Sequence, residues 1–479
     1  PAGGLVVGQS KDGKAIYLVG EDTHSLTFGA TRSGKSRSVV LPSICMTALA
    51  GESMVMTDIK RELYLSTAPF LKRLGYEVIA LDFDCPSKSD QYNFMQPVND
   101  RLESGDITGA KSAVNELVES LTGKSKQSER IWEEGEKSIL ACCMMAVAYD
   151  NRNNPQMQNL TNVYHFIANM CAPQEGQSTI PLQEYLENCP ENHPAKSLAG
   201  ISNVAHFRTR SSFYAAALAT LRLFEDYNIA DMTGRTSFNP YTTGQKKRAI
   251  FIILPDEKPA YYSVASLFVF QHYQALVATA KANGGRLPLR VEFFLDEVGN
   301  FSEIPYFEKL MTVGAGRGIR FHLFLQSSLQ LDEIYNKNRS SIIRSNCETW
   351  IYLHSDDSGT DEEISKHLGN YTTKSPGMSA PLQGNGGGNA SFNYIGRPLL
   401  TPEEVKKVAR PYQLVLSRSD PAVMFAPDIS KTIFNRMLGL GSKQHNIKVN
   451  KLRHERRKER PVRPPQLWKV WEAYKNITY

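Results

Sequence analysis

The sequence contains no long hydrophobic run. No apolar stretch among its 479 residues reaches the length of about 18 that a membrane-spanning helix requires. The two best candidates are residues 139–148, which number ten, and residues 261–280, which three polar side chains interrupt. No signal peptide is recognisable either. We therefore expect a soluble fragment, and a first residue of Pro1 rather than Met leads us to expect a preceding N-terminal piece.

Cysteine is scarce and irregularly spaced. The chain has seven cysteines, an odd number, and no two of them stand in C-x-x-C spacing. In a chain of this length the pattern argues against a disulfide framework and against a zinc site. It favours a reducing compartment.

A strong excess of charge is missing from most of the chain. The net charge is +6, but residues 443–469 hold ten Lys or Arg and two Glu, which leaves 45 basic and 47 acidic side chains elsewhere. The basic character therefore belongs to a C-terminal tail. Two interpretations are open: an arm for nucleic acid or acidic lipid, or a disordered, solubilising terminus. Three prolines within 461–465 exclude one continuous helix, so we expect an extended arm whose Trp468 and Trp471 stack on bases or dock on a partner.

Short apolar strands alternate with helical segments in the first part of the chain. A strand is expected at 25–28, followed by a glycine-rich turn and a helix from about 35 to 50. Two more strands are expected at 53–57 and 77–81, with a helix between them. This alternation predicts a mostly parallel sheet covered by helices, which is an α/β fold.

From residue 99 to residue 241 the pattern is helical, without a convincing strand, and the alternation returns at 248–254. We therefore predict an all-α domain, 99–241, inserted between two parts of one nucleotide-binding domain, 1–98 and 242–440. A basic tail, 441–479, follows.

Two further segments have a distinctive composition. Residues 260–281 are apolar nearly all round, which predicts a buried crossover helix. Residues 375–396 are rich in Gly, Ser and Asn and are expected to be a mobile loop, either functional or a surface hairpin without a role.

A glycine-rich motif follows the first expected strand and opens the first expected helix. It matches the full phosphate-loop pattern G-x-x-x-x-G-K-[ST] and consists of Gly29, Ala30, Thr31, Arg32, Ser33, Gly34, Lys35 and Ser36. In such a loop backbone N–H groups face the phosphates, the lysine reaches the β- and γ-phosphates, and the Ser/Thr hydroxyl contacts Mg²⁺. The start of the following helix adds favourable partial positive charge. The motif predicts a nucleotide and Mg²⁺ site.

The second half of such a site is an acidic pair at the end of an apolar strand. Asp296 and Glu297 follow the apolar run 293–295. We predict that Asp296 holds Mg²⁺ through water and that Glu297 orients and polarises the attacking water. The separation of about 260 residues from the phosphate loop is explained if the helical domain is inserted between them.

Two side chains beyond the acidic pair are candidates for completing the site. Gln326 follows the apolar run 321–325 and is predicted to touch the γ-phosphate; the alternative is a glutamine that caps a strand end. Arg317 lies in a glycine-rich segment and is a candidate arginine finger that reaches a neighbouring subunit; a structural helix-end arginine is equally open. Arg344 is a weaker candidate for that role. The scattered histidines His24, His322 and His354 are expected to be core or edge residues.

Several stretches resemble the coupling ATPases of conjugative and type IV secretion systems, members of the FtsK/HerA group of ring-shaped motor ATPases. They lie roughly within residues 5–440 and read HSLTFGATRSGKSRSVVLPS (24–43), MTDIKRELY (56–64), FLDEVGNF (294–301), GRGIRFHLFLQSSLQL (316–331) and RPLLTPEE (397–404). The family usually has Asp-Pro-Lys-Gly-Glu in the second stretch. This chain has Ile59 and Arg61 in place of the proline and the glycine, which leaves the local turn uncertain from sequence.

The resemblance implies a RecA-like nucleotide-binding domain that carries an all-α domain, with ATP and Mg²⁺ bound between the subunits of a homo-hexamer. It also implies an N-terminal membrane anchor, outside this chain, and a place on the cytoplasmic face of the bacterial cell membrane. The implied cargo is a relaxase-bound single DNA strand, and sometimes protein, delivered to secretion-channel proteins.

Two other functions stay open at the level of sequence. One is a general double-stranded DNA pump of the FtsK/HerA type, which the helical insertion disfavours. The other is a cargo-recruitment platform in which the nucleotide gates assembly and nothing is pumped.

Overall fold

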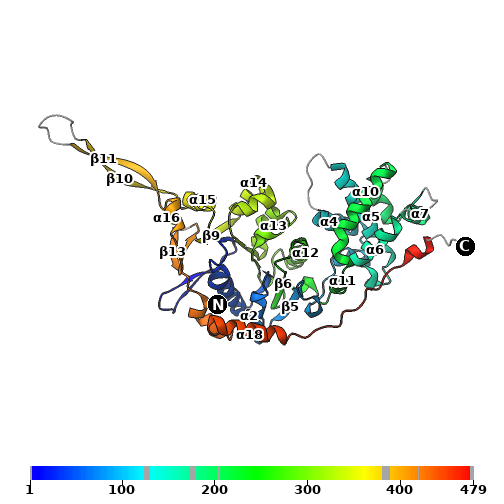
Figure 1. Cartoon of the computed structure of the whole chain (residues 1–479), viewed down its shortest axis with the longest axis horizontal. Coiled ribbons are helices and arrows are strands. Elements are labelled where there is room, and N and C mark those ends of the chain that lie inside the picture. The colour runs from blue at the N-terminus through cyan, green and yellow to red at the C-terminus, as the bar shows by residue number, and fades with distance from the viewer. Residues whose placement is uncertain are drawn as a thin grey trace. The chain divides into compact units, whose positions relative to one another are not determined.

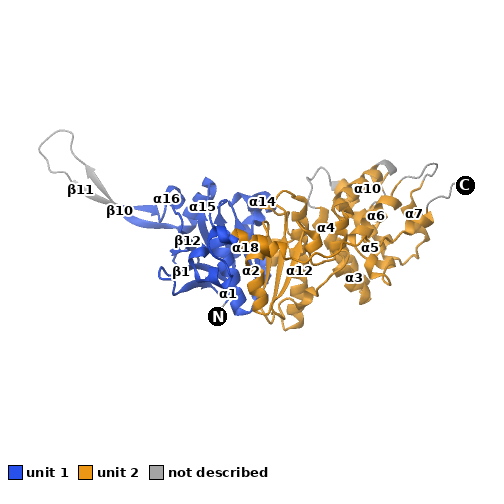
Figure 2. Ribbon diagram, turned by 60° about the horizontal axis from the view of Figure 1, so that its bottom comes forward, with its two compact units in different colours: residues 1–52, 292–299, 311–446 blue, residues 53–291, 300–310, 447–479 orange. Residues whose placement is uncertain are grey.

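The structure, a computed structural model, describes residues 3–122, 130–172, 179–201, 205–379, 389–418 and 420–474 (Figure 1). By their contacts these residues form two compact units, shown in two colours in Figure 2. Unit 1 comprises 1–52, 292–299 and 311–446, and unit 2 comprises 53–291, 300–310 and 447–479. Within the described ranges we find no helix with the length and hydropathy needed to cross a membrane.

Unit 1 is built on neighbouring strands in the order β13-β12-β9-β3-β8-β7. β3 pairs in parallel with β8 on one side and β9 on the other, whereas β12 runs antiparallel to β9 and β13. Every residue of β3 and of β8 is buried, which is typical of parallel strands in the interior of a sheet, and Ser25, Arg320 and His322 among them have partners inside the sheet. The bounds are β3 (His24–Gly29), β7 (Val291–Leu295), β8 (Ile319–Leu325), β9 (Cys347–His354), β12 (Tyr412–Leu416) and β13 (Ala422–Phe425).

Helices of unit 1 follow these strands. The described ones are α1 (Leu41–Ala50), α14 (Leu329–Ser345), α15 (Ser358–Leu368), α16 (Pro402–Lys406) and α17 (Ile433–Met437). A separate hairpin of β1 (Leu5–Gln9) and β2 (Ile16–Val19) is antiparallel.

Unit 2 combines three parallel strands with most of the helices. β6 lies between β4 and β5 and pairs in parallel with both. The strands are β4 (Ser53–Asp58), β5 (Glu77–Asp82) and β6 (Arg248–Ile253). The helices are α2 (Glu62–Arg73), α3 (Gln96–Glu103), α4 (Ile107–Thr122), α5 (Arg130–Asp150), α6 (Leu160–Met170), α7 (Pro181–Asn188), α8 (Pro194–Leu198), α10 (Phe207–Leu221), α11 (Tyr227–Thr233) and α12 (Ala260–Ala282).

The predicted α/β fold with a mostly parallel sheet is confirmed. Between β5 and β6 the described segments hold helices and turns and no named strand, and α12 is buried along most of its length, as its apolar sequence predicted. The domain boundaries at 98/99, 241/242 and 440/441 stay predictions, because contacts group the residues differently and place β4, β5 and β6 with the helices of unit 2.

For residues 375–396 the hairpin alternative is confirmed in the described parts. β10 (Asn370–Ser379) pairs antiparallel with β11 (Asn389–Pro398) over ten residues (Figure 1). Strand-favouring side chains such as Tyr371, Thr372 and Thr373 begin this ribbon. Residues 380–388, which hold four of the segment's glycines, lie outside the described part.

The basic tail forms a structured element, which we call the C-terminal strap and define as residues 447–474. It begins within α18 (Lys443–Glu455), continues as an extended segment and ends at the 3₁₀ turn Val470–Tyr474. Figure 1 shows it as the red segment that runs from beside α2 toward α7. All of it belongs to unit 2.

Three arginines fasten the first half of the strap. Arg453 donates from Nη1 to Leu65 O at 2.6 Å, Arg457 forms an ion pair with Asp82, and Arg460 forms one with Asp231. The Asp82 side chain is fully buried, so its charge depends on such a partner. Exposed basic residues alternate with these paired ones, so the strap has a docked side and a solvent side.

Arg61 explains how the chain departs from the family's usual Asp-Pro-Lys-Gly-Glu. It has φ 58°, in the left-handed region that glycine adopts without strain. Its guanidinium pairs with Asp82 and Asp84 and contacts the His454 ring at 3.3 Å. The strain of an arginine at this turn is therefore offset by a network that includes the strap.

Aromatic packing fastens the second half of the strap. Trp468 stacks on Phe166 of α6 with ring centroids 5.3 Å apart and an interplanar angle of 8°. Asn162 donates to Gln466 O at 2.9 Å and accepts from the Trp468 N–H at 2.7 Å. The expectation of a disordered terminus is therefore wrong for the described part of the strap. An arm for nucleic acid or acidic lipid stays a prediction, although Arg453, Arg457 and Arg460 already bind groups of this chain.

We expect Arg457→Ala to lower the free energy of unfolding by about 2–3 kcal/mol. Breaking a buried ion pair typically costs about 3–5 kcal/mol, and Arg61 remains as a second partner of Asp82. Urea denaturation measures the change, with exposed Lys458→Ala as the matched control, expected within about 0.5 kcal/mol of wild type. Unchanged stability together with weakened single-stranded DNA binding would instead establish a nucleic-acid arm.

Candidate functional site

The phosphate-loop motif lies at the carboxyl end of β3, inside unit 1. Phe28 is opposite Leu325 of β8, so the loop and Gln326 leave neighbouring parallel strands at the same level. The carboxyl ends of parallel strands are where α/β proteins bind ligands. A π-helical turn, Ser36–Val40, connects the loop to α1, an irregularity that is frequent at functional sites.

Two glycines and one strained residue give the loop its shape. A Cβ atom on Gly29 would lie 2.4 Å from Ser33 Oγ, so a larger residue there would displace the Ser33 hydroxyl. Gly34 has φ 95° and Arg32 has φ 65°, both in the left-handed region. Ala30 N–H donates to His354 O at 2.8 Å and Ser33 N–H donates to Ala30 O at 2.9 Å.

Polar groups within the loop lack protein partners. Ser33 Oγ is buried and has no hydrogen-bond partner among the described residues. Lys35 is 7% exposed, and among the described residues its ammonium group contacts two carbonyl oxygens, Gly29 O and Leu325 O, each at 3.4 Å. A buried ammonium group with such weak neutral acceptors suits an anionic ligand.

The acidic pair meets the phosphate loop. Ser36 Oγ donates to Asp296 Oδ2 at 3.2 Å, which joins residues 260 positions apart in sequence. Glu297 follows with φ 52° and donates from its N–H to Asp296 Oδ1 at 3.1 Å. This strained turn lies just beyond β7 and separates the carboxylates of Asp296 and Glu297, for which different roles are predicted.

Gln326 also lies beside the loop. Its Oε1 is 3.5 Å from Thr31 Oγ1, and its N–H donates to Gln330 Oε1 at 2.8 Å. The structure thus brings the phosphate loop, Asp296 and Gln326 together in unit 1. Their roles in binding or catalysis stay predictions.

The two candidate finger arginines differ in their contacts. Arg317, in the 3₁₀ turn after α13 (Phe307–Gly314), is partly exposed, and its Nε has no partner among the described residues. Arg344 donates to Ser328 O at 2.8 Å and pairs with Asp332 at 2.7 Å. Arg344 therefore stabilises α14, and of the two only Arg317 stays a candidate.

The strands β7 and β8 carry a buried ionic cluster that was not predicted from sequence. Glu292 of β7 pairs with Arg320 and with His322 Nε2, the latter at 2.7 Å, and both partners lie on β8. Ser25 of β3 hydrogen-bonds to His322 Nδ1 at 2.8 Å. All four side chains are at most 2% exposed. The cluster links the strands that carry the phosphate loop, the acidic pair and Gln326.

The cluster keeps its carboxylate ionised. Burial alone would raise the pKa of Glu292, but Arg320 and His322 outweigh it and lower the pKa to about 2. Burial lowers the pKa of His24 to about 4, and His24 Nε2 donates to Met311 O at 2.7 Å while its Nδ1 accepts from Phe321 N–H at 2.9 Å. The expected core histidines His24 and His322 are thus buried, whereas His354 lies at a strand end and is 40% exposed.

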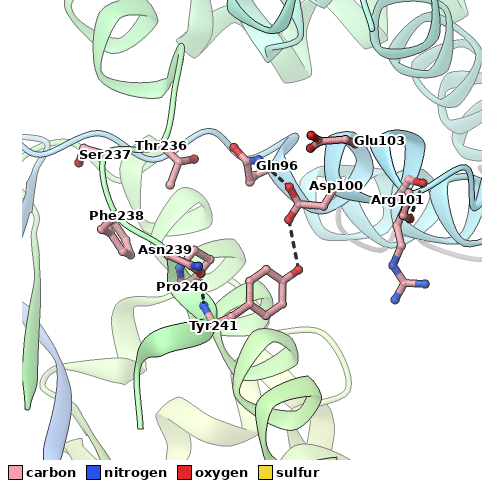
Figure 3. Close-up of a pocket in the computed structure, with 11 residues that line it drawn as sticks. Gln96, Asp100, Arg101, Glu103, Thr236, Ser237, Phe238, Asn239, Pro240 and Tyr241 are labelled. Atoms are coloured by element: carbon pink, nitrogen blue, oxygen red, sulfur yellow. Dashed lines mark hydrogen bonds between the residues drawn. The ribbon is translucent and has the colours of Figure 1, made fainter. Parts of the chain in front are cut away.

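A large cavity lies in unit 2, and none of these residues lines it. Its volume is about 840 Å³, and it is lined by α3 and by the segment 236–241 (Figure 3). Tyr241 Oη donates to Asp100 at 3.3 Å, Gln96 Nε2 donates to the same carboxylate at 2.7 Å, and burial raises the pKa of Asp100. Because both oxygens of Asp100 have partners within this chain, we assign the cavity no ligand.

Comparison with known proteins agrees with this geometry. Residues 2–433 match the family model described as type IV secretory system conjugative DNA transfer. The chain belongs to this family. The match includes the phosphate loop, the acidic pair and Gln326, and it ends before the strap.

Relatives within the family are longer than this chain. The conjugal transfer protein TraG of Escherichia coli is 26% identical over 434 residues, which cover 85% of this chain and 66% of the relative. The protein VirD4 of Agrobacterium fabrum is 25% identical over 411 residues, which cover 85% and 58%. The chain thus spans about two thirds or less of the length of these curated relatives.

Solved structures of the conjugative coupling protein TrwB share the fold. The trigonal form in complex with sulphate has a TM-score of 0.64 and 15% identity over 89% of this chain and 88% of that one. The complex with ADP and Mg²⁺ has a TM-score of 0.63 and 15% identity over 86% and 87%.

We expect Glu292→Gln to lower the free energy of unfolding by about 3 kcal/mol at pH 7, because Arg320 and His322 lose their charged partner. The folded pKa of about 2 lies below the unfolded value, so the carboxylate stabilises the fold fully above about pH 5 and loses this effect toward pH 2. Chemical denaturation should therefore show the variant and wild type converging as the pH falls toward 3.

Exposed Glu333→Gln is the control for this comparison and is expected to stay within about 0.5 kcal/mol of wild type. A deficit of Glu292→Gln that is equal at pH 7 and pH 3 would contradict the assigned charge state.

Proposed function

We propose that the chain is the ATPase core of a conjugative coupling protein, which uses ATP hydrolysis to deliver DNA to a type IV secretion channel. One observation carries the proposal: Ser36 of the phosphate loop hydrogen-bonds to Asp296 of the acidic pair at 3.2 Å. The phosphate loop and the acidic pair, which are far apart in sequence, therefore lie together in unit 1. Family membership supplies the biological context.

The residues present fit a magnesium nucleotide. Ser33 Oγ and the Lys35 ammonium group are buried donors that suit an anionic ligand. The side-chain oxygens of Ser36 and Asp296 are of the kind that Mg²⁺ prefers. Once held there, Mg²⁺ would supply positive charge that neutralises the phosphates. Complexes of TrwB with ADP and Mg²⁺ and with ADPNP support this choice of ligands.

Each remaining side chain has one task in this scheme. Lys35 contacts the β- and γ-phosphates, and the loop N–H groups hold the phosphate oxygens. Glu297 orients and polarises the attacking water. The strained turn at Glu297 separates its side chain from that of Asp296, so the two carboxylates can have different roles. Gln326, within 3.5 Å of Thr31, reports the presence of the γ-phosphate to β8.

Assembly and partners follow from the family and from Arg317. We propose a homo-hexamer in which the partly exposed Arg317 reaches the nucleotide of a neighbouring subunit. Its partners are a relaxase-bound single DNA strand and secretion-channel proteins, and its place is the cytoplasmic face of the bacterial membrane. VirD4 and TraG relatives support the secretion and conjugation context.

The proposal predicts that single-stranded DNA raises the rate of ATP turnover severalfold, because a motor hydrolyses faster while it engages its substrate. Phosphate release with and without an unstructured oligonucleotide measures this, and the Lys35→Ala variant corrects for contaminating ATPases. If duplex DNA raised the turnover rate as much as single-stranded DNA does, a general DNA pump would be favoured. Normal nucleotide binding without stimulation by any DNA would favour a recruitment platform and contradict the motor.

Glu297→Gln should bind ATP with nearly unchanged affinity and hydrolyse it about 10²–10⁴-fold more slowly, because water activation is lost while Ser36 and Asp296 remain. Lys35→Ala should lose both binding and turnover. A filter-binding assay and steady-state kinetics separate the two quantities. Loss of binding in Glu297→Gln would show that this residue has a structural or metal-binding role instead.

A further inference from the structure

One arginine outside the family's phosphate-loop motif contacts the loop from the same chain. Arg410 lies between α16 and β12, and its Nε and Nη2 donate to the carbonyl oxygens of Ser33 and Arg32. A Cβ atom on Gly34 would lie 2.5 Å from Nη2 and 2.6 Å from Cζ. The guanidinium therefore lies directly against the loop backbone, where the absence of a side chain at Gly34 admits it.

The backbone that carries Arg410 is held in place by the sheet. β12 begins at Tyr412 and pairs with β9 and β13. Ala426 N–H donates to Pro411 O at 2.7 Å, and Tyr412 N–H donates to Ala409 O at 3.0 Å. The contact with the loop thus starts from a fixed position.

Holding these carbonyl oxygens orients a loop amide. In a planar trans peptide the C=O of one residue and the N–H of the next point in opposite directions. When Arg410 holds Ser33 O, it turns the Gly34 N–H to the opposite side of the loop. In the described part of the chain that N–H donates to no protein acceptor, so it is available to a phosphate oxygen.

Among the described residues, no carboxylate forms an ion pair with Arg410. Its hydrogen bonds in the described residues go to the two loop carbonyls, which use two of five guanidinium donors. Arg37, just after the loop, contrasts with it, because it forms two hydrogen bonds to Asp428 at 2.6 and 2.9 Å. Arg410 therefore keeps its positive charge beside the place where the phosphates are expected.

We propose that Arg410 is a positioning residue for the nucleotide: it fixes the loop with the Gly34 N–H directed at the phosphates and adds a positive field in cis. This inference rests on the proposed ATPase function. It differs from the arginine finger in trans, because Arg410 acts within its own chain and through binding.

The test compares Arg410→Ala, Arg410→Lys and wild type in binding of a fluorescent ADP with Mg²⁺ and in steady-state ATP turnover. Loss of charge-assisted hydrogen bonds predicts weaker ADP binding in Arg410→Ala, on the order of tenfold to a hundredfold. The KM for ATP should rise in parallel while kcat stays within about threefold. Arg410→Lys, which keeps the charge and loses the fork of donors, should fall between the two.

Arg418→Ala is the matched control, since Arg418 follows β12, is exposed and pairs with Glu348 at 3.0 Å. It should bind ADP as wild type does. The thermal midpoint of each variant without nucleotide shows whether the fold is intact. If Arg410→Ala does not fold, Arg410→Lys decides: weakened ADP binding supports the proposal and wild-type binding overturns it.

The outcomes separate the two levels of inference. If wild type binds no nucleotide, the proposed function fails and Arg410 has nothing to position. If wild type binds ADP and folded Arg410→Ala binds it equally well, the proposed function stands and the role of Arg410 is overturned. A lower kcat with unchanged KM would also overturn it, because a positioning role acts on binding.

Discussion

The parallel pairing of β3 with its neighbours is the constraint on which the site depends. Because Phe28 is opposite Leu325, the phosphate loop and Gln326 emerge side by side. Because the acidic pair follows β7, the next strand beyond β8, Asp296 comes within 3.2 Å of Ser36. A shift of one residue in register would move every side chain of the shifted strand to the opposite face of the sheet. The strand pairing thus positions Asp296 and Gln326 beside the phosphate loop.

The buried cluster around Glu292 stabilises this strand register, although burying its charges costs free energy. A carboxylate, a guanidinium and an imidazole inside a sheet are expensive to desolvate, and removing one partner is more expensive still. The three groups lie on β7 and β8, and Ser25 joins them from β3. A register in which these groups missed one another would leave buried charges unpaired. Such a cluster favours one pairing of the strands over the alternatives.

Much of this was predictable from sequence, for identifiable reasons. The phosphate loop, the acidic pair and Gln326 are local patterns at the ends of apolar runs, and a parallel sheet brings such ends together. Arg410 and Glu292 were missed because their importance depends on partners about 380 and 30 residues away. The strap was misjudged because composition reports charge and not its partners: Asp82 and Asp231 are single acids with no pattern around them. The hairpin of β10 and β11 was one of two alternatives for its glycine-rich segment, and composition alone did not specify the strand pairing.

The central claim is that the phosphate loop and Asp296 form one site for a magnesium nucleotide. Thermal unfolding with ADP, in the presence and absence of Mg²⁺, tests it most directly in wild type, Ser36→Ala and Asp296→Ala. Ligand at a hundred times its Kd stabilises a folded protein by about 2.7 kcal/mol. The account predicts that ADP raises the wild-type midpoint, that Mg²⁺ raises it further, and that both variants lose this further rise. A midpoint that does not respond to millimolar ADP and Mg²⁺, or a Mg²⁺-dependent rise that survives in both variants, would contradict it.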